Sequence, residues 1–192
     1  MRRRSRSVAL VAIALASALS ACSRTGRQAD ALKAEAPGIE VLAEITFQVD
    51  DPENRPDGPS PYVNLADPEK DLKRMRGPEE VVCTATELIV VLDYPLRAEF
   101  RFPISASSSK GFTRTELVRK IADLYKRVYE EEDQTSKNPV VPLEQRKGLI
   151  NRNETSGKYG IWGHDLDDLV LHTIEISRTT DGTVLAHLGI DS

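Results

Sequence analysis

The sequence lacks the short motifs that carry several common enzyme chemistries. It contains no Gly-x-Ser-x-Gly elbow, no phosphate-binding loop ending in Lys-Ser or Lys-Thr, no His-Glu-x-x-His and no Cys-x-x-Cys. These absences remove the usual sequence evidence for a serine hydrolase, a P-loop nucleotide-binding protein, a zinc peptidase or a thiol oxidoreductase. No cofactor is expected.

An excess of basic residues is also missing, since the chain has 26 Lys and Arg against 30 Asp and Glu. Proteins that bind DNA or RNA present a basic patch that neutralises phosphates. An acidic chain has no such electrostatic footprint. Nucleic acid is therefore not an expected partner.

No apolar run is long enough to cross a bilayer. The longest, Val8 to Leu19, holds about a dozen residues, whereas a spanning helix needs roughly 20. A cluster of arginines, Arg2 to Arg6, precedes it. A positive head followed by a short apolar run is typical of a signal peptide that is removed.

The apolar run ends in the tetrapeptide Leu19-Ser20-Ala21-Cys22. This segment resembles the lipobox of bacterial lipoproteins, which consists of Leu, two small residues and Cys. The resemblance implies cleavage before Cys22, a diacylglyceryl group on its sulfur and acylation of the new amino terminus. The alternatives are an ordinary cleaved signal peptide with a cysteine nearby and a retained anchor helix.

Ser23 resembles the residue that sends many such lipoproteins to the outer membrane. The expected location is therefore the bacterial cell envelope, at the outer membrane and facing the periplasm. Loss of residues 1–21 removes four of the 26 basic residues, which leaves 22 against 30 acids and a formal charge of −8. Anionic lipid heads repel such a chain, so acyl chains must supply the membrane affinity, at about 0.8 kcal/mol per buried methylene.

The chain divides into three expected parts: a signal peptide at 1–21, a lipidated Cys22 with a flexible tether to residue 38, and one domain at 39–192. The polar, alanine-rich composition up to Pro37-Gly38 predicts the tether. If Cys22 is lipidated, Cys83 has no disulfide partner. Its apolar surroundings in VVCTATELIVVL favour a small buried residue over a nucleophile.

The predicted fold class is α+β, an antiparallel sheet of about five strands with one long amphipathic helix on one face. Composition and alternation predict strands at 39–50, 88–92 and 97–104, a short helix at 68–75, a long helix at about 113–132 and a closing hairpin. Asp181-Gly182 is typical of a two-residue hairpin turn. That turn would pair Ile176 with His187.

The long helix carries the clearest local signals. Thr113 and Glu116 form a capping box, and Phe112 and Leu117 occupy the positions of a hydrophobic staple. Pairs four residues apart, Glu116 with Lys120 and Asp123 with Arg127, support its polar side. An acidic run, 130–133, ends the helix where its dipole prefers cations. We expect a solvated, frayed end there, with a site for a cation or a basic partner as the alternative.

The long loop at 133–168 is the candidate functional region, because loops of this length tend to be functional or disordered. It holds the single tryptophan, and glycines alternate with Tyr159, Ile161 and Trp162 before His164 and three aspartates. The stretch GKYGIWGHD is similar to segments of uncharacterised proteins, so the similarity implies no activity.

Three interpretations of this loop compete. In the structural one, Tyr159 and Trp162 cover the sheet edge, Asp165 caps a short turn with Asp168, and His164 bonds only backbone. In the second, the same five residues grip an envelope protein or glycan.

The third interpretation is a metal site. His164, Asp168 and His172 would share one helical face and hold a divalent ion that activates water. Its weakness is that the composition from Leu169 onward favours a strand. The sequence therefore favours a lipid-anchored envelope protein that acts by binding or assembly, with a metal-dependent hydrolase centred on His164 as the alternative.

Overall fold

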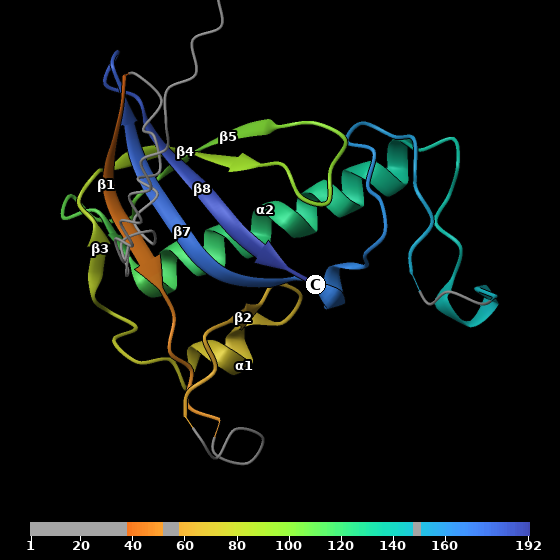
Figure 1. Ribbon diagram of the computed structural model, residues 1–192, viewed down its shortest axis with the longest axis horizontal. Coiled ribbons are helices and arrows are strands. Elements are labelled where there is room, and N and C mark those ends of the chain that lie inside the picture. Colours follow the sequence, from red (N-terminus) through yellow and green to blue (C-terminus); the bar gives the residue numbers. More distant parts are fainter. Residues whose placement is uncertain (1–37, 52–57, 148–150) are drawn as a thin grey trace, which may run out of the picture. The chain divides into compact units, whose positions relative to one another are not determined.

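A mixed sheet and one long helix form the α+β fold of the computed structural model (Figure 1). The structure describes residues 38–51, 58–147 and 151–192, which belong to one compact unit. The expected signal peptide, Cys22 and the tether up to residue 37 lie outside the described residues. No described helix is long and apolar enough to cross a membrane.

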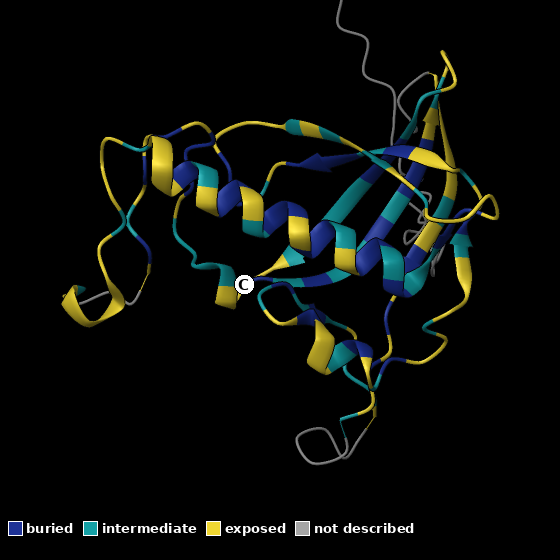
Figure 2. Ribbon diagram, turned by 180° about the vertical axis from the view of Figure 1, so that it is seen from behind, coloured by how far each residue is buried: buried dark blue, intermediate teal, exposed yellow. Residues whose placement is uncertain are grey.

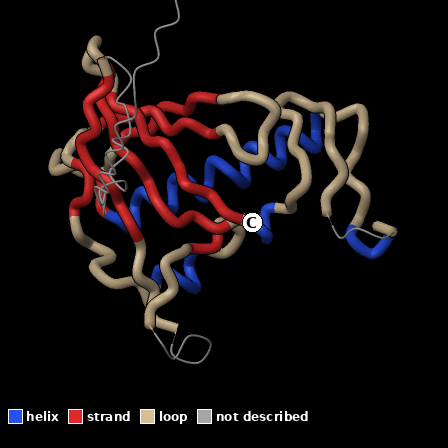
Figure 3. Tube along the Cα trace, in the orientation of Figure 1, coloured by secondary structure: helices blue, strands red, loops and turns tan. Residues whose placement is uncertain are grey.

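The strands are β1 (Ile39–Thr46), β2 (Val63–Asn64), β3 (Val81–Cys83), β4 (Glu87–Leu92), β5 (Phe100–Ser105), β6 (Phe112–Thr113), β7 (Val170–Thr179) and β8 (Val184–Asp191). The helices are α1 (Pro68–Leu72), α2 (Arg114–Thr135) and two 3-10 turns, η1 (Leu143–Gln145) and η2 (Leu166–Asp168). Figure 3 shows that loop connects α2 to β7 through these two turns.

The main sheet has the order β1-β7-β8-β4-β5, and β2 pairs with the end of β7. The β4–β5 hairpin is antiparallel as predicted, and so are β1–β7 and β7–β8. The β4–β8 pair is parallel, so the sheet is mixed rather than purely antiparallel. The difference arises because β8, the second strand of the β7–β8 hairpin, lies beside β4 of the earlier β4–β5 hairpin and runs in the same direction as β4.

Helix α2 packs against one face of this sheet, and Figure 2 shows buried and exposed bands alternating along it. The apolar stripe predicted from the sequence is buried, from Leu117 to Tyr129. The Thr113 hydroxyl accepts the amide of Glu116, and both members of the predicted staple, Phe112 and Leu117, are fully buried.

Two predicted polar contacts of α2 differ in the structure. The Glu116 carboxylate does not return to the helix cap; it accepts the amide and the hydroxyl of Ser107, both at 2.7 Å. Arg127 pairs with Glu131 at 3.8 Å rather than with Asp123, while the Glu116–Lys120 pair is present at 3.6 Å. Ser107, in the connector before the helix, therefore supplies the hydrogen bonds to Glu116 that the backbone amide of Thr113 was expected to supply.

The predicted register of the β7–β8 hairpin was wrong by one residue. Ile176 lies opposite Ala186, and His187 lies opposite Glu175. The turn contains three residues, because Gly182 donates its amide to the carbonyl of Thr179 and Thr179 pairs with Thr183. Gly182 has a φ of +86°, so it takes the left-handed position of a three-residue turn.

The core lies between α2 and the inner sheet face. Side chains of β5 alternate between half-buried and exposed, as the sequence predicted. Cys83 is buried at the edge of this core, and burial raises the pKa of its thiol. The prediction that Cys83 is a small buried residue is confirmed.

Candidate functional site

The acidic end of α2 holds the segment 151–169, which we name the Trp162 loop. Glu132 is fully buried, and its two carboxylate oxygens accept three backbone amides: Gly157 and Tyr159 at 2.7 Å each, and Gly160 at 3.0 Å. Burial would raise the pKa of Glu132, but hydrogen bonds from Thr155 and from these amides outweigh burial and lower it. Glu132 is therefore an ionised carboxylate inside a ring of N–H donors.

The residues on either side of Glu132 extend this attachment. Glu131 accepts the Lys158 ammonium and the Tyr159 hydroxyl, both at 2.6 Å, and these donors lower its pKa. Asp133 pairs at 2.8 Å with Arg152, whose side chain is only 4% exposed. The expected solvated, frayed end was wrong, because the basic partners of the acidic run come from this chain's own loop.

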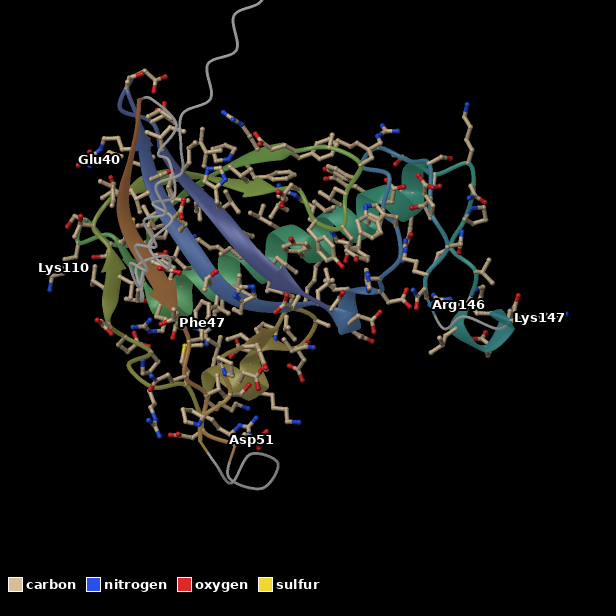
Figure 4. All side chains as sticks on the ribbon, viewed as in Figure 1. Glu40, Phe47, Asp51, Lys110, Arg146 and Lys147 are labelled. Carbon is tan, nitrogen blue, oxygen red and sulfur yellow. The ribbon has the colours of Figure 1, made fainter. Side chains whose placement is uncertain are left out.

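Two arginines hold the far part of the loop. The Arg152 guanidinium lies 5.1 Å from the centre of the Tyr129 ring and 3.5 Å from Asp165. Arg146 donates both terminal nitrogens to Asp165, one of them at 3.0 Å, and this pairing lowers the pKa of Asp165. Figure 4 labels Arg146 in the segment that leads into the loop.

Asp165 and Asp168 have the capping role that the structural interpretation predicted. Asp165 is the N-cap of η2, and its amide donates to the Asp168 carboxylate at 2.9 Å in a reciprocal capping box. These two aspartates are thus occupied by the turn and by arginines.

The aromatic residues of the loop separate into buried and exposed positions. Tyr159 is 1% exposed and packs its ring edge-on against Phe100 of β5, with ring centres 4.8 Å apart. It covers the sheet edge as predicted. Trp162 does not, since 41% of it remains exposed.

Trp162 belongs to a group of three rings that we name the aromatic cluster: Tyr94, Trp162 and His164. Tyr94 meets Trp162 edge-on at 5.3 Å, and His164 lies 5.7 Å from Tyr94 and 6.0 Å from Trp162. The Trp162 amide donates to the Pro95 carbonyl at 3.1 Å, which fixes the loop against the turn at 93–97. The rings therefore stand in defined positions relative to one another.

Polar atoms edge this cluster. The Ser192 hydroxyl lies 2.8 Å from the Tyr94 hydroxyl and 3.3 Å from Nε2 of His164. The structure brings the His164 ring into this network, whereas the structural interpretation gave it only backbone contacts; its carbonyl does accept the Tyr129 hydroxyl at 2.9 Å. The exposed Trp162 ring, beside the half-buried Tyr94 and His164 rings and a hydroxyl group, can contact a sugar face or an apolar side chain.

The three weak metal candidates are not brought together. The helical register that would link His164, Asp168 and His172 ends at η2, and His172 lies on β7, where it is 3.7 Å from Asp191. Among the residues that the structure describes, no three His, Cys, Asp or Glu side chains form a group that could hold a metal ion.

Sequence reasoning missed Tyr94, Arg146, Arg152 and Ser192. Three of them are distant in sequence from the loop core that they contact, and none belongs to a motif. No protein-family model, curated protein or solved structure matches the chain.

Proposed function

We propose that this chain is a lipid-anchored protein of the bacterial cell envelope that acts by binding, with the aromatic cluster as its contact surface for an envelope protein or glycan. The observation that supports binding is the exposed Trp162 ring, fixed edge-on to Tyr94 on a loop that the ion pairs of the buried Arg152 hold in place. Tryptophan and tyrosine supply large contact areas with few rotatable bonds, and they dominate many binding surfaces. The lipobox-like segment ending in Cys22 supports the envelope location.

The binding part is tested by capture from envelope extracts. The tagged full-length chain is compared with Trp162→Ala and with Leu143→Ala, which removes another exposed apolar side chain from the region between α2 and β7. Sedimentation with cell-wall sacculi tests a glycan partner, and cross-linking followed by mass spectrometry tests a protein. We expect Trp162→Ala alone to lose the partner; equal capture by all three would exclude the cluster as the contact surface.

The anchoring part is tested separately. Mass spectrometry of the chain from bacterial membranes should show an amino-terminal Cys22 that carries acyl chains, and Cys22→Ala should move the protein into the soluble envelope fraction. An unmodified Cys22, or a different amino terminus, would contradict the anchor without affecting the aromatic cluster.

A further inference from the structure

We propose that the aromatic cluster binds arginine or lysine side chains of a basic protein segment, whose positive charge is attracted by aspartates around the cluster. This assignment rests on the proposed function, because it concerns the same surface, and it specifies the chemistry of the partner. The cluster rings and the Ser192 hydroxyl meet where β8 ends, marked C in Figure 1.

Exposed aspartates accompany each segment that contributes to this surface. Asp93 directly precedes Tyr94, and Asp191 directly precedes Ser192. Two more belong to η2, which begins two residues after His164. The four exposed aspartates are Asp93, Asp167, Asp168 and Asp191. Three separate parts of the chain therefore bring negative charge to one surface.

The basic residues of the chain do not neutralise these four aspartates. No lysine or arginine in the described part of the chain forms an ion pair with any of them. Asp191 lies 3.7 Å from Nε2 of His172, whose ring carries a charge only when it is protonated. The acidic end of α2 differs, because Arg152 and Lys158 of the loop pair with it. The negative charge around the aromatic cluster is therefore available to a partner.

The aspartates beside Tyr94 and Ser192 lie close enough to act on a ligand of the rings. Consecutive Cα atoms are about 3.8 Å apart, and the Debye length at physiological ionic strength is about 8 Å. A cation on the cluster therefore lies about one Debye length from each of these two carboxylates. In water, a unit negative charge at about 8 Å raises the affinity for a cation roughly twofold.

The rings supply the second feature that favours a cation. Ammonium and guanidinium groups are attracted to the face of an aromatic ring, and most strongly to that of tryptophan. Trp162 is 41% exposed, and Tyr94 meets it edge-on at 5.3 Å, so the two rings fix each other and leave part of the Trp162 surface free. The hydroxyls of Tyr94 and Ser192 can accept hydrogen bonds from the N–H groups of a cation.

The charges distinguish between the ligands that could contact these rings. A neutral sugar would stack on Trp162 but gain nothing from the aspartates, and an anionic ligand would be repelled. Four carboxylates from three parts of the chain fit a segment with several positive charges better than a single ammonium group. The aliphatic stems of arginine and lysine also pack along apolar surface such as the Trp162 ring. A basic segment of a protein therefore fits this surface.

The first test compares two peptides that differ only in charge. An acetylated and amidated hexapeptide of alternating glycine and arginine is titrated into the full-length chain in mild detergent at about 20 mM salt, where charges act over a longer range. The control peptide has citrulline, the neutral analogue of arginine, at the same positions. Calorimetry should show at least about tenfold weaker binding of the control. The emission of Trp162, the single tryptophan, should change with the arginine peptide at concentrations where the control has no effect.

Two matched double variants locate the charge. Asp93→Asn with Asp191→Asn removes two carboxylates beside the cluster and should weaken binding about fourfold, from roughly twofold for each. Glu40→Gln with Glu87→Gln removes two exposed carboxylates at the opposite end of the sheet, near the β7–β8 turn, and should bind as the parent chain does. Circular dichroism verifies that both variants fold.

Variants of Trp162 test the ring. Trp162→Phe keeps a smaller ring and should weaken binding less than Trp162→Ala, because tryptophan attracts cations most strongly. Equal affinity of Trp162→Ala and the parent chain would overturn the proposal, since the peptide would then bind elsewhere on the acidic surface. Equal affinity for the two peptides, or equal affinities of the two double variants, would overturn it too. Binding of a glucosamine oligomer in place of the peptide would do the same, because an amino sugar would then be the ligand.

Capture from envelope extracts separates this proposal from the function on which it rests. We expect the double variant Asp93→Asn with Asp191→Asn to lose the partner, as Trp162→Ala does. If only Trp162→Ala loses it, the cluster contacts a partner without positive charge, and this proposal fails alone. If Trp162→Ala retains the partner, the proposed function fails as well.

Discussion

Replacement of Glu132 with glutamine should loosen the Trp162 loop and lower the stability of the whole domain. One carboxylate oxygen accepts Gly157, and the other accepts Tyr159 and Gly160. Glutamine keeps the shape of the side chain but has one oxygen and one NH2 group. Whichever way it turns, at least one buried amide donor faces another donor.

The expected loss is about 3 kcal/mol. A hydrogen bond to a charged acceptor contributes at least about 1.5 kcal/mol, and one to a neutral oxygen at least about 0.5 kcal/mol. In the better orientation, three bonds of the first kind become two of the second, which is a loss of about 3.5 kcal/mol at these lower values. A neutral side chain also costs less to bury than a carboxylate, and this lowers the loss slightly. For a domain of this size, 1 kcal/mol shifts the melting temperature by about 2–4 °C. The melting temperature of Glu132→Gln should therefore fall by about 6–12 °C.

Thermal unfolding followed by circular dichroism gives this shift, and the fluorescence of Trp162, the single tryptophan, reports on the loop itself. The matched control is Glu130→Gln on the same helix, at an exposed position. The control removes the same charge and should change stability by less than about 0.5 kcal/mol. Equal melting temperatures for the two variants would show that the buried carboxylate does not hold the loop.

The same contact predicts a pH dependence. The pKa of Glu132 in the folded chain lies below its ordinary value of 4.5, so its contribution to stability is fully present above about pH 4.5 and is lost as the pH falls through the folded pKa. The gap in melting temperature between the parent chain and Glu132→Gln should be constant from neutral pH down to about pH 5 and shrink below that. A gap independent of pH would contradict the role of the ionised form.

Four further substitutions test the packing of the loop by thermal unfolding. Gly157→Ala should lower the stability by about 1–3 kcal/mol, because its Cβ would lie 2.6 Å from the carbonyl oxygen of Glu132. Gly163→Ala is the matched control, because open space surrounds this residue. It should lower the stability by only about 1 kcal/mol, since its φ of +76° is unfavourable for alanine. Arg152→Met should cost about 1–3 kcal/mol, less than the 3–5 kcal/mol of a fully buried pair because both its carboxylate partners are partly exposed. Trp162→Ala should cost about 1 kcal/mol, well below the 3–5 kcal/mol of a buried tryptophan; a larger loss would mean that the ring has a structural role.

The sequence predicted those parts of the fold whose signals lie within a few residues of each other. The start of α2 follows from the hydrogen bond between Thr113 and Glu116 and from the burial of both Phe112 and Leu117, residues at most five apart. The alternation of β5 is equally local. Such patterns need no knowledge of the rest of the chain, because neighbouring residues alone decide them.

The role of the acidic run could not be predicted in this way. Glu132 contacts amides 25 to 28 residues further along the chain, and Arg152 is 19 residues from Asp133. One signal was present, since three glutamates and an aspartate end a helix where the dipole prefers cations. Negative charge at this end of a helix is unfavourable unless another part of the chain supplies positive charge. Arg152 and Lys158 of the Trp162 loop supply it here.

The hairpin register failed for a different reason. Asp181-Gly182 is typical of a two-residue turn, in which both residues need positive φ, yet only Gly182 has it. Thr179 instead closes a three-residue turn with Thr183, and the Asp181 carboxylate accepts the amide of Thr183 at 3.1 Å. The carboxylate of Asp181, at the second position of the turn, therefore favours the three-residue turn over the two-residue turn, although both turns have nearly the same composition.

Trp162 directly follows three buried residues of the loop. Tyr159, Gly160 and Ile161 are buried, and the chain then reaches the surface, where 41% of Trp162 is exposed. Outward orientation by itself therefore requires no ligand. What distinguishes Trp162 from an ordinary exposed residue is that Tyr94, from the turn at 93–97, and Ser192, after β8, converge on the same place as His164. Three separate segments thus supply rings and hydroxyl groups at one surface, which is the arrangement that a binding site requires.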